Sequence, residues 1–327
     1  MSAQDRLASA QVEAATGRHH DVGLALGTRI GSDIHWRNRL DALAKLADRV
    51  ELAGTRADLT QSTLDAVAKL GSSFMEILTG ARGSGSGQST ASSAAKSALQ
   101  TLADLMNVTY DGEFVFGGIN STSPPISNYA GGPAEVAVNG TFLAAFGFLP
   151  TDPAAATITG PAMKSFLDGP FATLFASPAW ESGWSAAGSD GVKTRLGPGL
   201  AVDASTTPAR AGIAALAEAL TMAFALGEGN LGQPAFEAIV DKALSLVATA
   251  QQSLGTEQTR MGLAQEQMTS ALHRYRVQTG ILTRNVAGLE GVDPYEAASR
   301  VNALMSQLEI SYTLTGKLSG LSLVNFI

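Results

Sequence analysis

The chain has 327 residues and a formal net charge of −7, with acidic and basic residues interspersed. This balance gives no basic patch for nucleic acid or an anionic membrane surface, so we expect neither as a partner. The sequence contains no cysteine, which excludes disulfides and thiolate chemistry. The most apolar run, residues 211–226, is too short to span a bilayer and contains Glu218, so we expect no membrane insertion.

The N-terminal part predicts two helices separated by a loop. Apolar spacing predicts the first helix over Ala3–Thr16, ended by the glycine that follows. Residues 18–31 contain three glycines and no clear period, which predicts an ordered loop. The second helix is predicted to begin at a cap formed by Ser32 or Asp33 and to run to about Leu78.

A third helix follows, and after it the composition of the chain changes. Residues 80–87 are rich in glycine and serine and predict a turn, after which Ser89 or Thr90 caps a helix that reaches about residue 108. An Asp-Gly pair then indicates a turn, and residues 113–116 a short strand. Residues 120–205 are rich in Gly, Pro, Ser and Asn and predict an inserted α+β domain.

The C-terminal part contains the strongest pattern in the chain. A helix is predicted from Thr207-Pro208 to about residue 226, and Pro234 opens a much longer one. Between residues 236 and 289, apolar residues recur at every seventh position. These are Val240, Val247, Leu254, Met261, Met268, Tyr275, Leu282 and Leu289.

That seven-residue repeat requires a partner helix. As a helix, residues 236–289 would be about 80 Å long and could not bury the repeat alone. The helix to Leu78 has similar spacing and is its predicted antiparallel partner. Gln251, Gln258 and Gln265 occupy one edge of the repeat, where we interpret them either as a device that sets the register or as partly exposed residues.

The last helix is apolar on more than one side. Asp293 is its predicted N-cap, Pro294 takes the first helical position, and Glu296 can complete a capping box. We predict that this helix runs to about residue 323 and forms an assembly interface. The predicted interface residues are Val301, Leu304, Leu308, Tyr312, Leu318 and Leu321, with Met305, Ile310, Leu314 and Leu323 apolar outside that stripe.

Four stretches resemble the flagellin family. They read LASAQVEAATGRHHDVGLALG (7–27), LADLMNVTYDGEFVFGGINSTSPPI (102–126), QTRMGLAQEQM (258–268) and VDPYEAASRVNALMSQLEISYTLTGKLSGLSLVNFI (292–327). They cover the two ends of the chain and not the insert, and the last is the most specific. In sequence, these stretches are more similar to the hook–filament junction members of the family than to the filament subunits.

The resemblance implies a mainly α, flagellin-like fold: a long antiparallel coiled-coil-like helical rod with an inserted α+β domain. The expected divisions are residues 1–31, 32–119, 120–206, 207–291 and 292–327. It also implies an extracellular structural subunit of the flagellum that assembles into a ring. Its implied partners are a hook-associated protein, flagellin and an export chaperone, with type III export and no cleaved signal peptide. The alternative is a filament flagellin.

The first helix is shorter than the resemblance leads one to expect. Family members have an N-terminal helix long enough to pair with the C-terminal one, whereas only about 16 residues precede Gly17. We therefore expect that about 20 N-terminal residues are missing from this chain. The alternative is a natural start that leaves the C-terminal helix partly unpaired.

No catalytic, cofactor or metal site is predicted, and we expect no enzyme. His19 and His20 adjoin an aspartate, but adjacent side chains seldom converge on one ion. The GSGSG at 83–87 lacks the Lys-Ser/Thr of a phosphate loop, and no His-Glu-x-x-His is present. Trp180 and Trp184 could bind a sugar or a host surface, although tryptophans four residues apart are more often core.

Overall fold

The structure is a computed structural model that describes residues 2–84, 86–188, 190–210 and 212–320. The chain divides into two compact units, residues 1–48 with 272–327 and residues 49–271. The described helices are α1 (Ala3–Thr16), α2 (Val22–Leu26), η1 (Gly27–Arg29), α3 (Ile30–Ala81), α4 (Gly87–Met106), α5 (Pro133–Phe146), η2 (Pro153–Thr157), α6 (Gly160–Phe166), η3 (Leu167–Phe171), η4 (Ala172–Phe175), α7 (Ala179–Gly183), α8 (Ile213–Thr221), η5 (Met222–Leu226), α9 (Gln233–Glu290) and α10 (Pro294–Gly320). The described strands are β1 (Thr109–Tyr110), β2 (Glu113–Phe114), β3 (Lys193–Gly197) and β4 (Leu200–Asp203).

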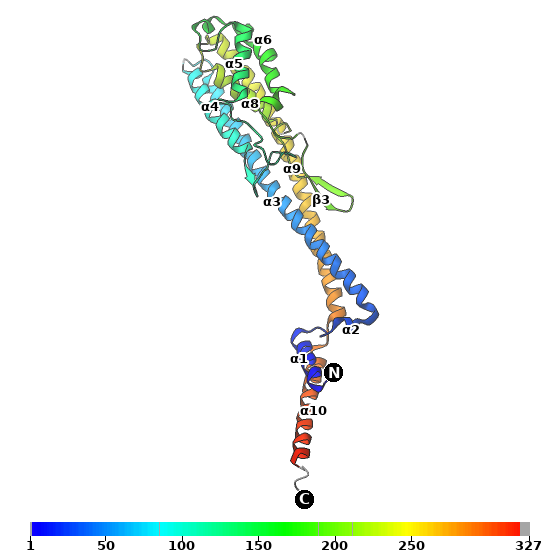
Figure 1. Ribbon diagram of the computed structural model, residues 1–327. Coiled ribbons are helices and arrows are strands. Elements are labelled where there is room, and N and C mark those ends of the chain that lie inside the picture. The colour runs from blue at the N-terminus through cyan, green and yellow to red at the C-terminus, as the bar shows by residue number, and fades with distance from the viewer. Residues whose placement is uncertain (1, 85, 189, 211, 321–327) are drawn as a thin grey trace. The chain divides into compact units, whose positions relative to one another are not determined.

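Within residues 49–271, α3 and α9 run antiparallel and side by side (Figure 1). The seven-residue repeat forms their common seam, so the predicted rod is confirmed. Side chains at this spacing are buried on both helices because each apolar row covers the other. The buried residues are Val240, Val247, Leu254, Met261 and Met268 on α9, and Val50, Ala57, Leu64 and Leu78 on α3.

The three glutamines of α9 all bond across the seam. Each side-chain amide donates to α3, and successive acceptors lie further toward the start of α3 as α9 proceeds, as an antiparallel pair requires. The bonds run from Gln251 Nε2 to the Ala68 carbonyl at 2.6 Å, from Gln258 Nε2 to Asp65 Oδ1 at 2.6 Å, and from Gln265 Nε2 to Asp58 Oδ1 at 2.7 Å. We call these three residues the glutamine ladder.

Gly71 makes room for the first bond of the ladder. It occupies the next seam position after Leu64, and a Cβ there would lie 2.7 Å from Gln251 Nε2. Without a side chain at Gly71, Gln251 can cross the helix surface to the Ala68 carbonyl and to Ser72 Oγ, 3.2 Å away. The space left by the absent side chain at Gly71 is therefore filled by a side chain from the opposite helix.

The short strands form two separate hairpins. Strands β1 and β2 pair antiparallel, and Asp111 and Gly112 between them both have positive φ, of 52° and 79°. A two-residue turn with both φ positive suits the twist of a hairpin, which explains the Asp-Gly pair. The predicted strand at 113–116 is shorter than expected and ends at Phe114. Strands β3 and β4 form the second antiparallel hairpin.

The insert has an aromatic core. Trp180 and Trp184 are each 3% exposed and stack with ring centroids 5.9 Å apart, and Tyr129 stacks on Trp184 at 5.7 Å. The structure thus places both tryptophans in the core, and neither presents a face to a sugar. The other buried rings are Phe142, Phe166, Phe171 and Phe175.

Two predicted starts near the N-terminus differ from the structure. Residues 18–31 contain α2 and η1 rather than only a loop, and α3 begins at Ile30. Asp21 caps α2 by accepting from the Leu24 amide at 2.9 Å, so helical turns begin earlier than Ser32. Asp33 is not a cap, because its carboxylate lies within the first turn and accepts from Arg37.

Two later helix starts also differ. Helix α4 begins at Gly87, before Ser89 and Thr90, because the chain passes so close to Ala81 that only glycine fits. Helix α8 begins at Ile213 rather than at Thr207-Pro208. The segment before it is tied to α9 by hydrogen bonds that sequence spacing does not reveal, described below.

Candidate assembly site

The helix that carries the predicted interface has the expected N-cap, Asp293, while Glu296 bonds to Arg300 in place of the expected capping box. Asp293 Oδ1 accepts from the Tyr295 amide at 2.8 Å, and Pro294 occupies the first helical position. The Glu296 carboxylate accepts from Arg300 at 2.8 Å, so it braces the first turn through a side chain. Helix α10 thus begins where the sequence places it.

Helix α1 packs along α10. Its own start has the full capping box, with Ser2 and Asp5 bonding reciprocally, and Gly17 ends it in a left-handed conformation. Arg300 Nη1 lies 3.1 Å from the Glu13 carboxylate and links the two helices. One short helix therefore covers one side of α10 over part of its length.

The predicted interface residues separate into covered and open groups. Val301, Leu304 and Leu308 are half-buried, as expected beside α1. Tyr312 accepts a hydrogen bond from Gln4 at 2.7 Å yet remains 59% exposed, and Leu318 is 66% exposed. Leu321, like Leu323, lies outside the described residues.

Further apolar side chains extend this exposed surface. We call the exposed apolar residues of α10 together the open face, although they lie on more than one side of the helix; they are Met305, Ile310, Tyr312, Leu314 and Leu318. A soluble helix with an apolar stripe normally buries it against a neighbour, and large exposed apolar patches mark interaction sites. Apart from the hydrogen bond from Gln4 to Tyr312, the described residues leave these side chains exposed, each by at least 44%.

A buried carboxylate links the base of this helix pair to the long helices. Glu290, the last residue of α9, is 1% exposed and is paired with both Arg18 and Arg37. Burial raises the pKa of Glu290, but the Arg37 hydrogen bond and the charges of Arg37 and Arg18 outweigh it, so the pKa lies below its usual value. Backbone bonds add to this clamp, from the His19 amide to the Glu290 carbonyl and from the Val292 amide to the Gly17 carbonyl.

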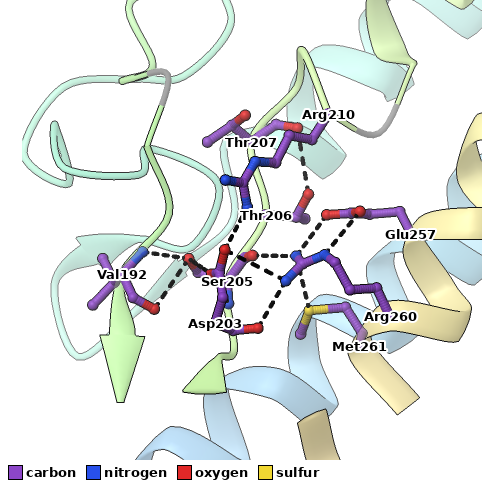
Figure 2. A network of polar contacts seen from close by, with 9 residues as sticks. All are labelled: Val192, Asp203, Ser205, Thr206, Thr207, Arg210, Glu257, Arg260 and Met261. Carbon is purple, nitrogen blue, oxygen red and sulfur yellow. Dashed lines mark hydrogen bonds and ion pairs between the residues drawn. The ribbon is translucent and has the colours of Figure 1, made fainter. Parts of the chain in front are cut away.

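A second polar network anchors the insert to α9 (Figure 2). Arg260 donates to the carbonyls of Asp203 and Ser205, at 2.7 and 2.5 Å. Its guanidinium also forks onto Glu257, at 2.6 and 3.0 Å. Burial raises the pKa of Glu257, but hydrogen bonds from Arg260 and Thr206 lower it by more. The pKa therefore lies below its usual value, and the carboxylate stays charged. This network fixes the segment that follows β4 and explains why no helix begins at Thr207.

The same network positions the β3–β4 hairpin. Arg210 lies 2.5 Å from the Asp203 carboxylate, and Ser205 Oγ accepts from the Val192 amide at 2.6 Å, so both ends of the hairpin are held (Figure 2). Neither this network nor the Glu290 clamp was predicted. The sequence contains the charges, but their partners lie far apart along the chain.

The remaining candidate residues form no centre. Within the ranges that the structure describes, no group of three His, Asp or Glu side chains is placed to hold a metal ion. His19 lies 3.7 Å from Glu13. No helix in the described part is long and apolar enough to cross a membrane.

Comparison with known families identifies both ends of the chain. Residues 1–121 match the family model for the bacterial flagellin N-terminal helical region, and residues 244–327 match that for the C-terminal helical region. The chain belongs to the flagellin family. The two matches contain α1, α3, α4 and α10 and most of α9, and they leave the insert unmatched. No curated protein matches the chain in sequence.

A solved structure supports the flagellin-like fold. It is that of a protein from Vibrio parahaemolyticus described as a flagellar hook-associated protein. The two are 11% identical, with a TM-score of 0.56, over 80% of this chain and 97% of the other. As a flagellin-family member, this chain has a structural role in the bacterial flagellum, where members of the family self-assemble and associate with other flagellar components.

Proposed function

We propose that this chain is a junction subunit between hook and filament, assembled through α10. The open face carries the proposal for assembly, because the described residues leave the apolar side chains of that face exposed on α10. Burying one large aliphatic side chain is worth about 1.5–3 kcal/mol, so several together offset the cost of ordering the helices. Val301, Leu304 and Leu308 continue the interface under α1, and Leu321 extends it in our proposal.

The choice of junction over filament has separate support. The Vibrio parahaemolyticus protein of similar fold is described as hook-associated, and four stretches of this chain resemble junction members of the family. We propose residues 32–119 and 207–291 as the rod that transmits load, residues 120–206 as an outward-facing domain, and residues 1–31 and 292–327 as the assembly region. The subunits would form a ring between a hook-associated protein and flagellin, after export with a chaperone.

Immunogold labelling separates the two functions. Antibody against this chain should label one band at the hook–filament boundary of intact flagella. Label along the whole filament would instead identify a filament subunit, present in thousands of copies rather than in one ring. The measurement requires no variant and is independent of the assembly surface.

A substitution on the open face tests the assembly surface. Leu318→Asp should abolish incorporation into flagella and motility in a complemented strain, because it places a charge in the proposed interface. Ser306→Asp is the control, since it adds the same charge to α10 and removes no apolar surface. Normal incorporation of Leu318→Asp would contradict the proposal.

A further inference from the structure

A groove of about 480 Å³ lies in the unit formed by residues 49–271. About two turns of α3 form one wall, and the β1–β2 turn and the start of β3 form the others. The residues that define its character are Arg49, Leu52, Arg56, Tyr110, Lys193 and Arg195. We call it the hairpin groove.

The hairpin groove is basic in a chain whose net charge is −7. Arg56 is already used, by the Glu113 carboxylate at 3.1 Å and the Phe114 carbonyl at 2.9 Å. Arg49, Lys193 and Arg195 are exposed, and none of them forms an ion pair with a described residue. With Glu113 neutralised by Arg56, the groove presents three free cations against the single carboxylate of Asp111.

One wall of the groove is an unpaired strand edge. Strand β3 pairs with β4, and that two-stranded sheet contains no other described strand. Residues 192–195 line the groove, whereas β4 residues line a different hollow beside Arg260 on α9. Residues 192–195 therefore border the groove, and no described strand pairs with them on the side away from β4. A strand with one neighbour can pair along its other edge with another extended chain, here over residues 193–195.

We propose that the hairpin groove binds an extended, carboxylate-bearing segment of another polypeptide, which adds a strand to β3. Main-chain bonds to β3 would fix the segment, and alternate side chains would then point to one side at period two. Lys193 and Arg195 are two residues apart on β3 and share a face, so carboxylates at every second position of the segment would meet them. Leu52 and Val192, which are 54% and 42% exposed, offer apolar contact to the residues between.

The rigid mounting of the hairpin suits this role. Binding by strand addition loses affinity if the receiving strand must first become ordered. The Arg260 network holds both ends of the β3–β4 hairpin against α9, so β3 is fixed before a partner arrives (Figure 2). The cations of the groove are thereby presented at fixed spacing.

The test uses the full-length protein and a labelled peptide with acidic residues at alternate positions, Gly-Glu-Val-Glu-Val-Glu-Gly. Fluorescence anisotropy should show saturable binding at low salt that weakens as salt rises, because surface charge pairs are screened. The same peptide N-methylated at both its glutamates and its valines, which cannot complete the ladder in either register, should bind at least about tenfold more weakly, a loss of about 1.4 kcal/mol. The peptide with lysine in place of glutamate should not bind.

A matched pair of charge reversals locates the site. Arg195→Glu should weaken binding of the acidic peptide by about tenfold or more, since it removes one attraction and adds a repulsion. Lys69→Glu, at an exposed position of α3 outside the groove, changes the net charge equally and should leave binding unchanged.

Several results would overturn the proposal. These are absence of saturable binding, equal loss in the two variants, or equal binding of the N-methylated peptide. Tighter binding of a single-stranded oligonucleotide than of the acidic peptide would identify the groove as a general polyanion surface and would also overturn it. The readout involves no flagellar assembly, so it is independent of the junction assignment.

Discussion

Helices α9 and α10 follow one another in the chain, and both carry apolar residues at helical spacing. Those of the α9 seam are buried, whereas many of those on α10 are exposed. On α9, Leu254 and Met261 are almost fully buried against α3. On α10, Leu314 and Leu318 are more than half exposed, although α1 covers the first part of the helix. An apolar repeat therefore indicates that a helix needs a partner, but it does not indicate whether the partner belongs to the same chain.

The difference has a measurable form. Substitutions in the α9 seam should change the free energy of unfolding, whereas those on the open face of α10 should change assembly and leave unfolding alone. Three experiments test this contrast and one tests a buried carboxyl group of α8, beginning with the largest expected effect on stability.

The largest effect is expected from Leu254→Asp. Its side chain is 1% exposed in the seam, and placing an unpaired carboxylate there should destabilise the fold by about 4 kcal/mol or more. Leu263→Asp is the matched control, because Leu263 is on the same helix and 61% exposed, and it should cost less than about 1 kcal/mol. Urea unfolding of both variants measures the two changes in the free energy of unfolding. Similar midpoints would show that the seam is not what holds α9.

The next effect depends on pH. Glu218 of α8 is 7% exposed, and its Oε1 has no hydrogen-bond partner in the described part of the chain. Burial raises the pKa of Glu218 from 4.5 to about 7, with Lys242 opposing and Asp168 adding to the shift. Between those two values the folded state binds more of this proton than the unfolded state does, so stability falls as pH rises toward 7 and then levels off.

Glu218→Gln should remove that fall. At pH 8 the variant should be more stable than the parent by up to about 3 kcal/mol, with little difference near pH 4.5. Urea unfolding at several pH values measures it, and Glu266→Gln, at an exposed position of α9, serves as the control. A gain that is the same at every pH would show that ionisation of Glu218 is not the cause.

The third experiment examines the seam where a polar residue crosses it. Gly71→Ala should gain up to about 1 kcal/mol from helix propensity but lose about the same when the new Cβ displaces Gln251 from the Ala68 carbonyl. The net change should be close to zero.

In a Gln251→Ala background the same Gly71→Ala change has nothing to displace. It should then stabilise by about 1 kcal/mol, so the double-mutant cycle should give a coupling of about that size. Additive effects of the two substitutions would mean that the contact contributes nothing to stability.

The smallest effect on stability is expected from Leu318→Asp. Because this side chain is 66% exposed, the substitution should change the free energy of unfolding by less than about 0.5 kcal/mol. The same variant should nevertheless fail to assemble. A large loss of stability would place Leu318 in an intramolecular core and remove the contrast between the two helices.

The helical plan could be predicted because it depends on local patterns. The first helix begins and ends where expected, since Gly17 gives a clear stop, and Asp293-Pro294 fixes the start of α10. The long pair was predictable because Val247 and its seven-residue neighbours require a partner of similar length.

The candidate site was only partly predictable. The apolar stripe of α10 is visible in the sequence, but α1 decides that Leu304 is half-buried while Leu318 is not. The partners of Glu290 and Arg260 could not be predicted, because Arg18 and Asp203 come from distant segments and a charged residue alone does not indicate its counterion. The bonds from Arg260 to the segment after β4 also explain why α8 does not begin at Thr207, although the proline that follows Thr207 favours a helix start there.

The glutamine ladder has a mechanical consequence. Its donors recur every seven residues, whereas its acceptors on α3, the Ala68 carbonyl and the carboxylates of Asp65 and Asp58, are three and seven residues apart. A slip of seven residues, about 10 Å, would bring Gln251 and Gln258 opposite Asp65 and Asp58 but would take Gln251 away from Gly71 and from the Ala68 carbonyl. We therefore expect the observed register to be favoured over the one shifted by seven residues, and the pair to resist axial slip under load, because the space above Gly71 accepts Gln251 in the observed register alone.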